Sequence, residues 1–156
     1  MDPYQAQFDT RQETPAYWHN KSHDLLISAR ILWKAMQENK SLEVNCWATY
    51  KMLMGMSFEL LFKAHCVGAD VTFSSTHDLV ALAHTANLPT SKDEKQILRV
   101  LSEYVIWDGR YPTPKKPEHL KDHWKCQAKL LDDKLDLENL MPVWRRFSDS
   151  FMAQYN

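Results

Sequence analysis

Hydrophobic residues recur along most of this chain at the spacing of one face of an α-helix. From residue 15 to about residue 38 they come at steps of three, four or seven, at Trp18, Leu25, Ala29, Leu32 and Met36. Thr14 and Pro15 suit the start of this helix, as its cap and its first residue. A second helix is predicted from about Glu43 to Val67. Apolar side chains cover most of its circumference, as in the central helix of a bundle.

The rest of the chain predicts shorter helices joined by loops. These helices are expected at residues 77–86 with Thr76 as the cap, 91–107 with Ser91 as the cap, 118–131 and 139–155. Gly68 is expected to end the second helix in a left-handed conformation, and Gly109 to end the fourth. Pro142 is expected in the first turn of the last helix, where proline is tolerated. Residues 110–117 contain three prolines and are predicted to form an irregular loop.

These elements predict an all-α fold, a four- to six-helix bundle with an up-down core. We expect one domain over residues 14–156, preceded by a polar N-terminal arm over residues 1–13. The last helix has an apolar stripe, consisting of Leu140, Trp144, Phe147, Phe151 and Tyr155. This stripe belongs either to the core or to the seam of a homodimer, to which Trp33 and Met36 would add.

The composition and charge of the chain indicate which kinds of binding partner and which cellular compartment to expect. The 156 residues are 44% hydrophobic and 25% charged, with a net charge of −1, so contact with nucleic acid would need a local basic patch. The cysteines Cys46, Cys66 and Cys126 are too widely spaced to suggest a disulfide framework. There is no signal-peptide pattern and no uninterrupted apolar stretch of membrane-spanning length. We therefore expect a cytoplasmic protein with no membrane contact and no cofactor.

Three short segments follow one another in a recognisable order. They are Glu59 with Lys63-Ala64, then His77-Asp78-Leu79, and then Arg110-Tyr111-Pro112 preceded by Tyr104. Over residues 15–120 their order and spacing resemble those of the HEPN family of small helical domains. The resemblance implies a HEPN-like bundle that commonly forms a homodimer. It also implies binding of a nucleotide or RNA in a defence or toxin–antitoxin system, and some members are metal-independent ribonucleases.

The chain departs from the nuclease members of that family at one point. Those members have an arginine followed by four to six residues and a histidine. Here the nearest pairs are Arg11 with His19 and Arg110 with His119, separated by seven and eight residues. The alternative is therefore a catalytically silent interaction module that docks onto a separately encoded nucleotidyltransferase or other effector. Whether the protein is an enzyme stays open at this point.

The polar residues of these segments have structural and functional interpretations. Glu59 and Lys63 are one helical turn apart and can form an ion pair. If they are buried, each needs a further partner, and Arg110 is the expected partner of Glu59. The result is either a polar clamp or a ligand-binding cleft. Asp78 suits the cap region of a helix, whereas His77 could instead contact phosphate or act in catalysis.

The best local basic patch follows the fourth helix. Arg110, Lys115 and Lys116 supply charge, and Trp107 and Tyr111 supply rings on which bases can stack. If the protein cleaves RNA, Arg110 is expected to stabilise phosphate charge. His77 or His119 would then be the general acid or base.

A metal site is a further alternative at the fifth helix. His119, His123 and Cys126 are spaced by four and three residues, so all three lie on one helical face. No diagnostic metal-binding signature accompanies them. The prediction is therefore that no metal is bound, with this trio as the candidate if one is.

Overall fold

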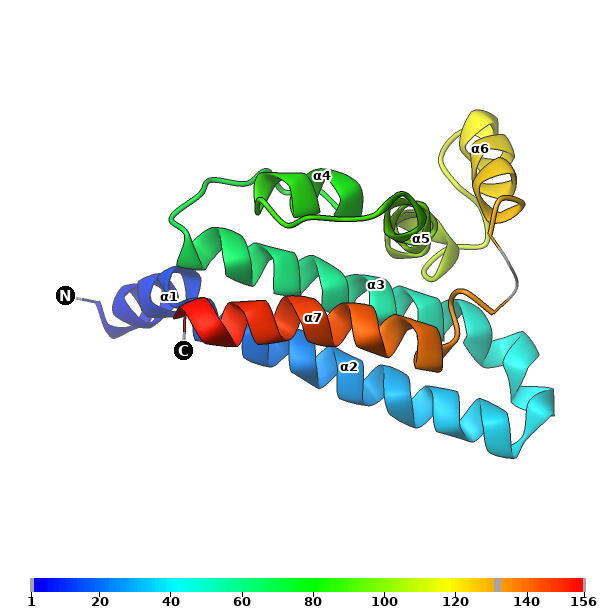
Figure 1. Cartoon of the computed structure of the whole chain (residues 1–156), viewed down its shortest axis with the longest axis horizontal. Coiled ribbons are helices and arrows are strands. Elements are labelled where there is room, and N and C mark those ends of the chain that lie inside the picture. The colour runs from blue at the N-terminus through cyan, green and yellow to red at the C-terminus, as the bar shows by residue number, and fades with distance from the viewer. Residues whose placement is uncertain (1, 131–132, 156) are drawn as a thin grey trace.

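The computed structural model describes residues 2–130 and 133–155, and every regular element in them is helical. The long helices are α2 (Pro15–Glu38), α3 (Glu43–Gly68) and α7 (Leu137–Tyr155). The shorter ones are α1 (Pro3–Glu13), α4 (Leu79–Thr85), α5 (Lys92–Glu103) and α6 (Pro117–Gln127), with a 3-10 turn η1 (Lys40–Leu42) and a π-helical segment η2 (Tyr104–Asp108). The all-α bundle is thereby confirmed (Figure 1).

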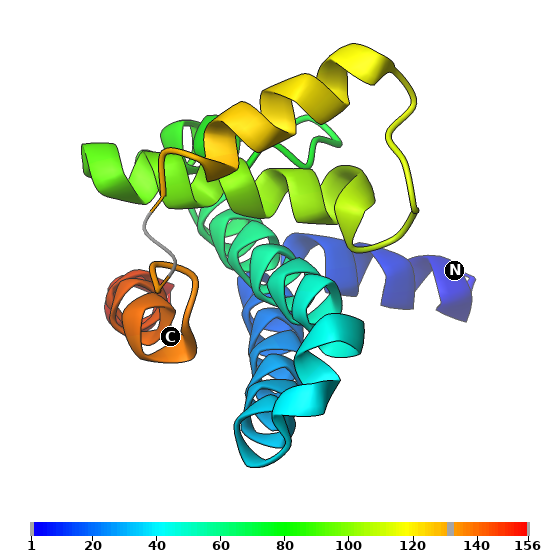
Figure 2. The same ribbon diagram turned by 90° about the vertical axis from the view of Figure 1, so that its right-hand side faces the viewer.

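Helix α3 is the centre of the bundle. It runs antiparallel to α2 after the tight turn at η1, and α7 lies along both helices. Helices α4 and α5 pack on another side of α3 (Figures 1 and 2). Because α3 is covered from several directions, it must be apolar around most of its circumference, as its sequence predicted.

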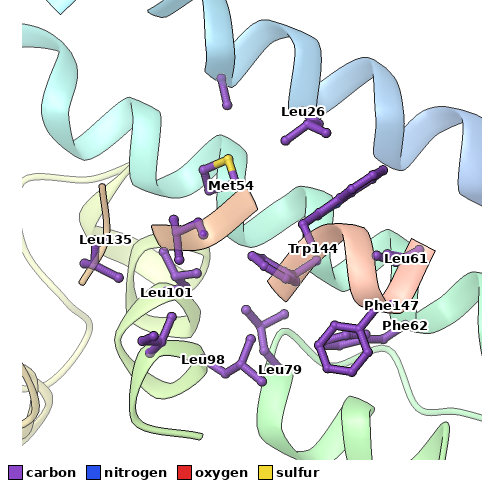
Figure 3. Close-up of a cluster of buried hydrophobic side chains, with 14 of the residues drawn as sticks. Leu26, Met54, Leu61, Phe62, Leu79, Leu98, Leu101, Leu135, Trp144 and Phe147 are labelled. Atoms are coloured by element: carbon purple, nitrogen blue, oxygen red, sulfur yellow. The ribbon is translucent and has the colours of Figure 1, made fainter. Parts of the chain in front are cut away.

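The core forms where α2, α4, α5 and α7 meet α3. Met54, Leu61 and Phe62 of α3 are fully buried. Figure 3 shows them among residues of the surrounding helices, namely Leu26, Leu79, Leu98, Leu101, Trp144 and Phe147. The ring of Phe147 meets that of Phe62 edge to face, with centroids 5.2 Å apart, the geometry that aromatic pairs favour.

The apolar stripe of the last helix belongs to this core and not to a dimer seam. Trp144, Phe147 and Phe151 are at most 4% exposed, and Met36 is fully buried. Trp144 also donates a hydrogen bond from Nε1 to Ser57 Oγ at 2.8 Å. Side chains that are already buried within one chain cannot cover a second copy, so a homodimer would need another surface.

The expected N-terminal arm is instead a helix. Asp2 caps α1 by accepting a hydrogen bond from the Tyr4 amide at 3.0 Å, and Pro3 is the first helical residue. This is a standard start signal. None of the residues in α1 is buried. The helix touches the bundle chiefly at its C-terminal end, where Trp18 Nε1 donates to the Gln12 carbonyl at 3.0 Å.

Several predicted helix ends differ from the observed ones. The cap of α4 is Asp78, whose side chain accepts from the Ala81 amide at 3.0 Å, and not Thr76. Gly68 is helical, and the left-handed residue after α3 is Asp70, with φ of 55°. A Cβ on Gly68 would lie 2.7 Å from the Tyr155 ring. That glycine therefore permits close packing and not a turn.

Two further boundaries are shifted. Pro142 lies inside α7 and not in its first turn, because that helix begins at Leu137. The predicted fifth helix is shorter, ending at Gln127, and residue 131 lies outside the described residues. Ser91 caps α5 as predicted, in a capping box with Glu94. Among the described residues, no helix is long and apolar enough to cross a membrane.

Candidate functional site

Glu59 lies at the centre of a buried polar cluster on α3. Its Oε1 accepts a hydrogen bond from Lys63 Nζ at 2.6 Å, and its Oε2 accepts from His77 Nδ1 at 2.9 Å. The side chains of Glu59 and Lys63 are 8% and 11% exposed. The helical spacing alone brings Glu59 to Lys63. The second partner is His77, from the loop before α4, and not Arg110 as predicted.

The pair with Glu59 determines how the His77 ring is oriented. A carboxylate can only accept a hydrogen bond, so His77 Nδ1 must carry a proton. In the neutral imidazole, Nε2 is then the basic nitrogen. The side chain of His77 is 46% exposed, and this exposure leaves the ring accessible to a ligand. A buried carboxylate that orients a histidine in this way is a common arrangement in sites that bind metals or move protons.

Next to this cluster is a cavity of about 330 Å³. Its walls are largely apolar, formed by Met52, Met56, Leu60 and Val105. Its polar lining consists of Glu59, His77 and Arg110. An apolar cavity with a few polar groups in its lining is typical of small-molecule sites.

A second cavity, of about 720 Å³, adjoins the first because both are lined by His77 and Arg110. It contains most of the predicted site residues, and its lining is completed by Ile106, Trp107, Tyr111, Pro112, Thr113, Pro114, Lys115 and His119. Among the predicted basic residues, Lys116 is not part of this lining and is the N-cap residue of α6.

The two aromatic residues of this cavity differ in availability. Tyr111 is 52% exposed, and its ring lies under the Arg110 guanidinium with Cζ 5.1 Å from the centroid. Trp107 is only 6% exposed and donates from Nε1 to Glu103 Oε2 at 2.9 Å. Tyr111 is thus accessible from solvent, although its Oη accepts a hydrogen bond from Arg110 Nη2 at 3.2 Å. Trp107 instead forms part of the wall.

The backbone that presents Arg110 is a π-helical turn. The Gly109 amide donates to the Tyr104 carbonyl at 2.9 Å, the five-residue step of a π-helix. Such turns are frequent at functional sites. A Cβ on Gly109 would overlap the Met52 side chain and lie 2.8 Å from the Tyr104 carbonyl oxygen. Glycine therefore lets this turn pack directly against α3, next to the smaller cavity.

His119, His123 and Cys126, the candidate metal ligands, are not brought together. The side chain of His123 is fully buried, and its Nε2 lies 2.8 Å from Asp108 Oδ2 and 2.7 Å from Gln127 Nε2. His119 lines the large cavity, whereas Cys126 packs against the core. Within residues 2–130 and 133–155, no group of three or more His, Cys, Asp or Glu side chains is arranged to hold a metal ion.

A buried polar network continues from His123 toward α3. Tyr104 Oη donates to Gln127 Oε1 at 3.1 Å and accepts from Lys51 Nζ at 2.9 Å. Lys51 also lies 4.5 Å from the centroids of Trp47 and Tyr104. Burial lowers the pKa of Lys51 to about 8 and raises the pKa of Tyr104. The sequence offered no signal for this network, which ties α6 and η2 to α3.

The remaining predicted site residues have mainly structural contacts. Asp78 caps α4, as one of its two interpretations proposed. Lys63 forms its ion pair with Glu59, and its Nζ also lies 5.7 Å from the centroid of the Phe73 ring. By contrast, Arg110 and Lys115 form no ion pair with a carboxylate of the described residues. Their charges are therefore available to an anionic ligand.

Sequence and structure comparisons add no relative to this picture. No family model, no curated protein and no solved structure matches the chain, so the interpretation of the site depends on the geometry of its own residues.

Proposed function

We propose that this protein is a HEPN-like domain that binds the phosphate of a nucleotide or an RNA in the two adjoining cavities around His77 and Arg110. One observation carries the proposal. His77, Arg110 and His119 come from three separate segments and line the same cavity of about 720 Å³. The order of segments that resembles HEPN domains supports the family assignment.

The chemistry of the lining suits a nucleotide. Arg110 can form paired hydrogen bonds with phosphate oxygens, which is the geometry that guanidinium groups favour. Lys115 adds charge to the same cavity. The exposed Tyr111 ring can stack on a base. The apolar cavity beside Met52 and Met56 can accept a base or another flat apolar group.

RNA cleavage is a second candidate, because the large cavity holds two histidines and an arginine. His77 Nε2 would accept the proton of a ribose 2′-hydroxyl while that oxygen forms a bond to phosphorus. The bond from phosphorus to the 5′-oxygen would break, and His119 would donate a proton to this leaving oxygen. Arg110 would stabilise the added negative charge on the phosphoryl oxygens. The products are a 2′,3′-cyclic phosphate and a free 5′-hydroxyl.

The test separates binding from cleavage. Binding of a labelled twelve-nucleotide RNA is measured by fluorescence anisotropy, and cleavage of the same RNA is followed in EDTA. We expect Arg110→Ala to weaken binding by about tenfold or more, while Arg145→Ala, on α7 and outside the cavities, leaves it unchanged. In the cleavage arm, His77→Gln and His119→Gln should each abolish product formation without abolishing binding.

The outcomes distinguish the proposal from its alternative. RNA affinity that is the same in wild type and Arg110→Ala contradicts binding at this site. Binding without cleavage limits the function to recognition. If wild type neither binds nor cleaves, the interaction module that docks onto a nucleotidyltransferase becomes the better explanation, and recovery of a stable complex with such a partner supports it.

A further inference from the structure

A third cavity, of about 260 Å³, extends the proposed site toward the N-terminus. It is lined by Arg11, Tyr17, Trp18, Lys21 and Leu60. Leu60 also lines the cavity of about 330 Å³, which in turn shares His77 and Arg110 with the largest one. The three cavities therefore adjoin one another in a row, and the two smaller ones meet at Leu60 of α3. Figure 2 shows α1 and the loop after η2 on the same side of α3, away from α7.

The fold holds the third cavity in a defined shape. Tyr17 and Lys21 are one turn apart on α2, so they face the same side. Trp18 is fixed by its hydrogen bond to the Gln12 carbonyl and by the Phe73 ring, 5.7 Å away and nearly perpendicular to it. This contact holds α1, and with it Arg11, against the start of α2. The third cavity is thus built from two helices whose relative position the half-buried Trp18 fixes.

The charges of this cavity are available to a ligand. Arg11 forms no ion pair with the carboxylates of residues 2–130 and 133–155. Among the residues that the structure describes, Lys21 pairs only with Asp24, at 3.6 Å, and both side chains are about two-thirds exposed, at 66% and 67%. An exposed pair of this kind is weak. Tyr17, which is 49% exposed, adds a free ring beside the two cations.

The arrangement of charge along the surface identifies the class of ligand. Cations and an exposed tyrosine lie at each end, Arg11, Lys21 and Tyr17 at one and Arg110, Lys115 and Tyr111 at the other. The apolar cavity lies between them, along α3. The eight helical steps from Met52 to Leu60 alone span about 12 Å. A mononucleotide is too short to engage both ends, whereas a single strand can place phosphates on the cations and bases on the rings.

We infer that the three cavities form one path for single-stranded RNA, with a distal subsite at Arg11, Tyr17 and Lys21. This inference depends on the proposed function, because the proximal end of the path is the site around Arg110. Beyond the proposed function, the inference states that the ligand is longer than a mononucleotide and that it also contacts residues of α1 and α2.

The test compares ligands of different length on variants of each end. Affinities of the full chain for uridine 5′-monophosphate and for a twelve-nucleotide oligouridine are measured by calorimetry at several salt concentrations. The double variant Arg11→Ala/Lys21→Ala should weaken oligouridine binding about tenfold and lower its salt slope by about 1.4, the value for two lost phosphate contacts. Its affinity for the monophosphate should be unchanged. Lys34→Ala/Arg145→Ala removes the same charge elsewhere and should change neither affinity.

The stacking contact has its own matched pair of variants. Tyr17→Phe keeps the ring and should bind oligouridine like wild type, whereas Tyr17→Ala should bind at least about fivefold more weakly. Circular dichroism of every variant checks that α1 and the bundle remain folded. Trp18 is left unchanged, because its contacts hold α1 in place.

Each outcome bears on a different claim. If Arg110→Ala weakens both ligands but Arg11→Ala/Lys21→Ala binds oligouridine like wild type, the path is wrong and the proximal site stands. If Arg110→Ala weakens neither ligand, or wild type binds neither, the proposed function fails and the path fails with it. An oligoglutamate peptide that displaces oligouridine with equal affinity would show a general anion surface, which also overturns the RNA path.

Discussion

His77 Nδ1 lies 2.9 Å from Glu59 Oε2, although the two residues are 18 positions apart and only Glu59 is in a helix. This contact joins the loop before α4 to the central helix. Both oxygens of the Glu59 carboxylate are therefore hydrogen-bonded, Oε1 to Lys63 and Oε2 to His77. The polar clamp predicted between Glu59 and Arg110 is therefore not formed, because His77 is the second partner of Glu59, and Arg110 lines the adjoining cavity instead.

The buried pair of Glu59 and Lys63 gives a double-mutant prediction. Glu59→Leu leaves the Lys63 ammonium without its carboxylate and should lower the free energy of unfolding by about 3 kcal/mol or more. Glu59→Leu/Lys63→Leu removes both charges and should recover most of that loss. Urea unfolding followed by circular dichroism measures both variants. A double variant less stable than the single one would contradict this explanation.

The cap of α4 can be separated from the neighbouring site residue. Asp78→Ala removes the acceptor for the Ala81 amide and should lower the free energy of unfolding by about 1 kcal/mol. Asp78→Ser keeps a capping oxygen and should retain most of the stability. Neither variant should change RNA affinity, because Asp78 lines neither cavity around Arg110. Weaker RNA binding by Asp78→Ser would place Asp78 in the site after all.

The glycine at the end of the π-helical turn should control where Arg110 lies. Gly109→Ala introduces a methyl group that overlaps Met52, and such overpacking typically costs about 1–3 kcal/mol of stability. We expect RNA affinity to fall as well, because the turn carrying Arg110 must move away from α3. Gly109→Ala/Met52→Gly removes the Met52 Cβ and Cγ that the methyl group would meet and should bind RNA more tightly than Gly109→Ala. If the double variant binds no better, the overlap is not what displaces Arg110.

Two histidines outside the site predict how stability depends on pH. His19 Nε2 lies 2.8 Å from Ser148 Oγ, and His65 Nε2 donates to the Phe147 carbonyl at 2.8 Å, so both link other helices to α7. Burial lowers the pKa of each from its ordinary value of 6.5. The unfolded chain therefore binds protons at a higher pH than the folded one, and acidification favours unfolding.

The expected result is a loss of stability as the pH falls from above 6.5 through the lowered pKa values of these histidines. His65→Gln keeps a hydrogen-bond donor but cannot titrate. This variant should therefore lose less stability than wild type between about pH 7.5 and about pH 5. Urea midpoints at several pH values measure this difference. The series stops above the ordinary pKa of Glu94, 4.5, because Arg146 lowers the pKa of that carboxyl and its own contribution is lost below this value. If the urea midpoints of wild type and His65→Gln fall in parallel with pH, His65 does not contribute to the acid destabilisation.

The local parts of the fold follow from short stretches of sequence. Helices α2, α3 and α5 are predicted by apolar periodicity and by cap residues such as Ser91, which act within a few positions along the chain. Helix α1 could also have been predicted, since Asp2-Pro3 is a start signal. The absence of an apolar face made residues 1–13 resemble a polar arm.

The sequence by itself determined most of the helices, and five residues that it singled out, His77, Arg110, Tyr111, Lys115 and His119, line one cavity. Only the tertiary structure decided that His77 pairs with Glu59 and that His123 is buried and pairs with Asp108. It also decided that the apolar stripe of α7 faces the core. It alone placed Arg11 and Lys21 in a cavity adjoining the site through Leu60. Helix periodicity and capping depend on neighbours a few residues away. The partners of a side chain depend on how distant helices pack, which no local pattern encodes.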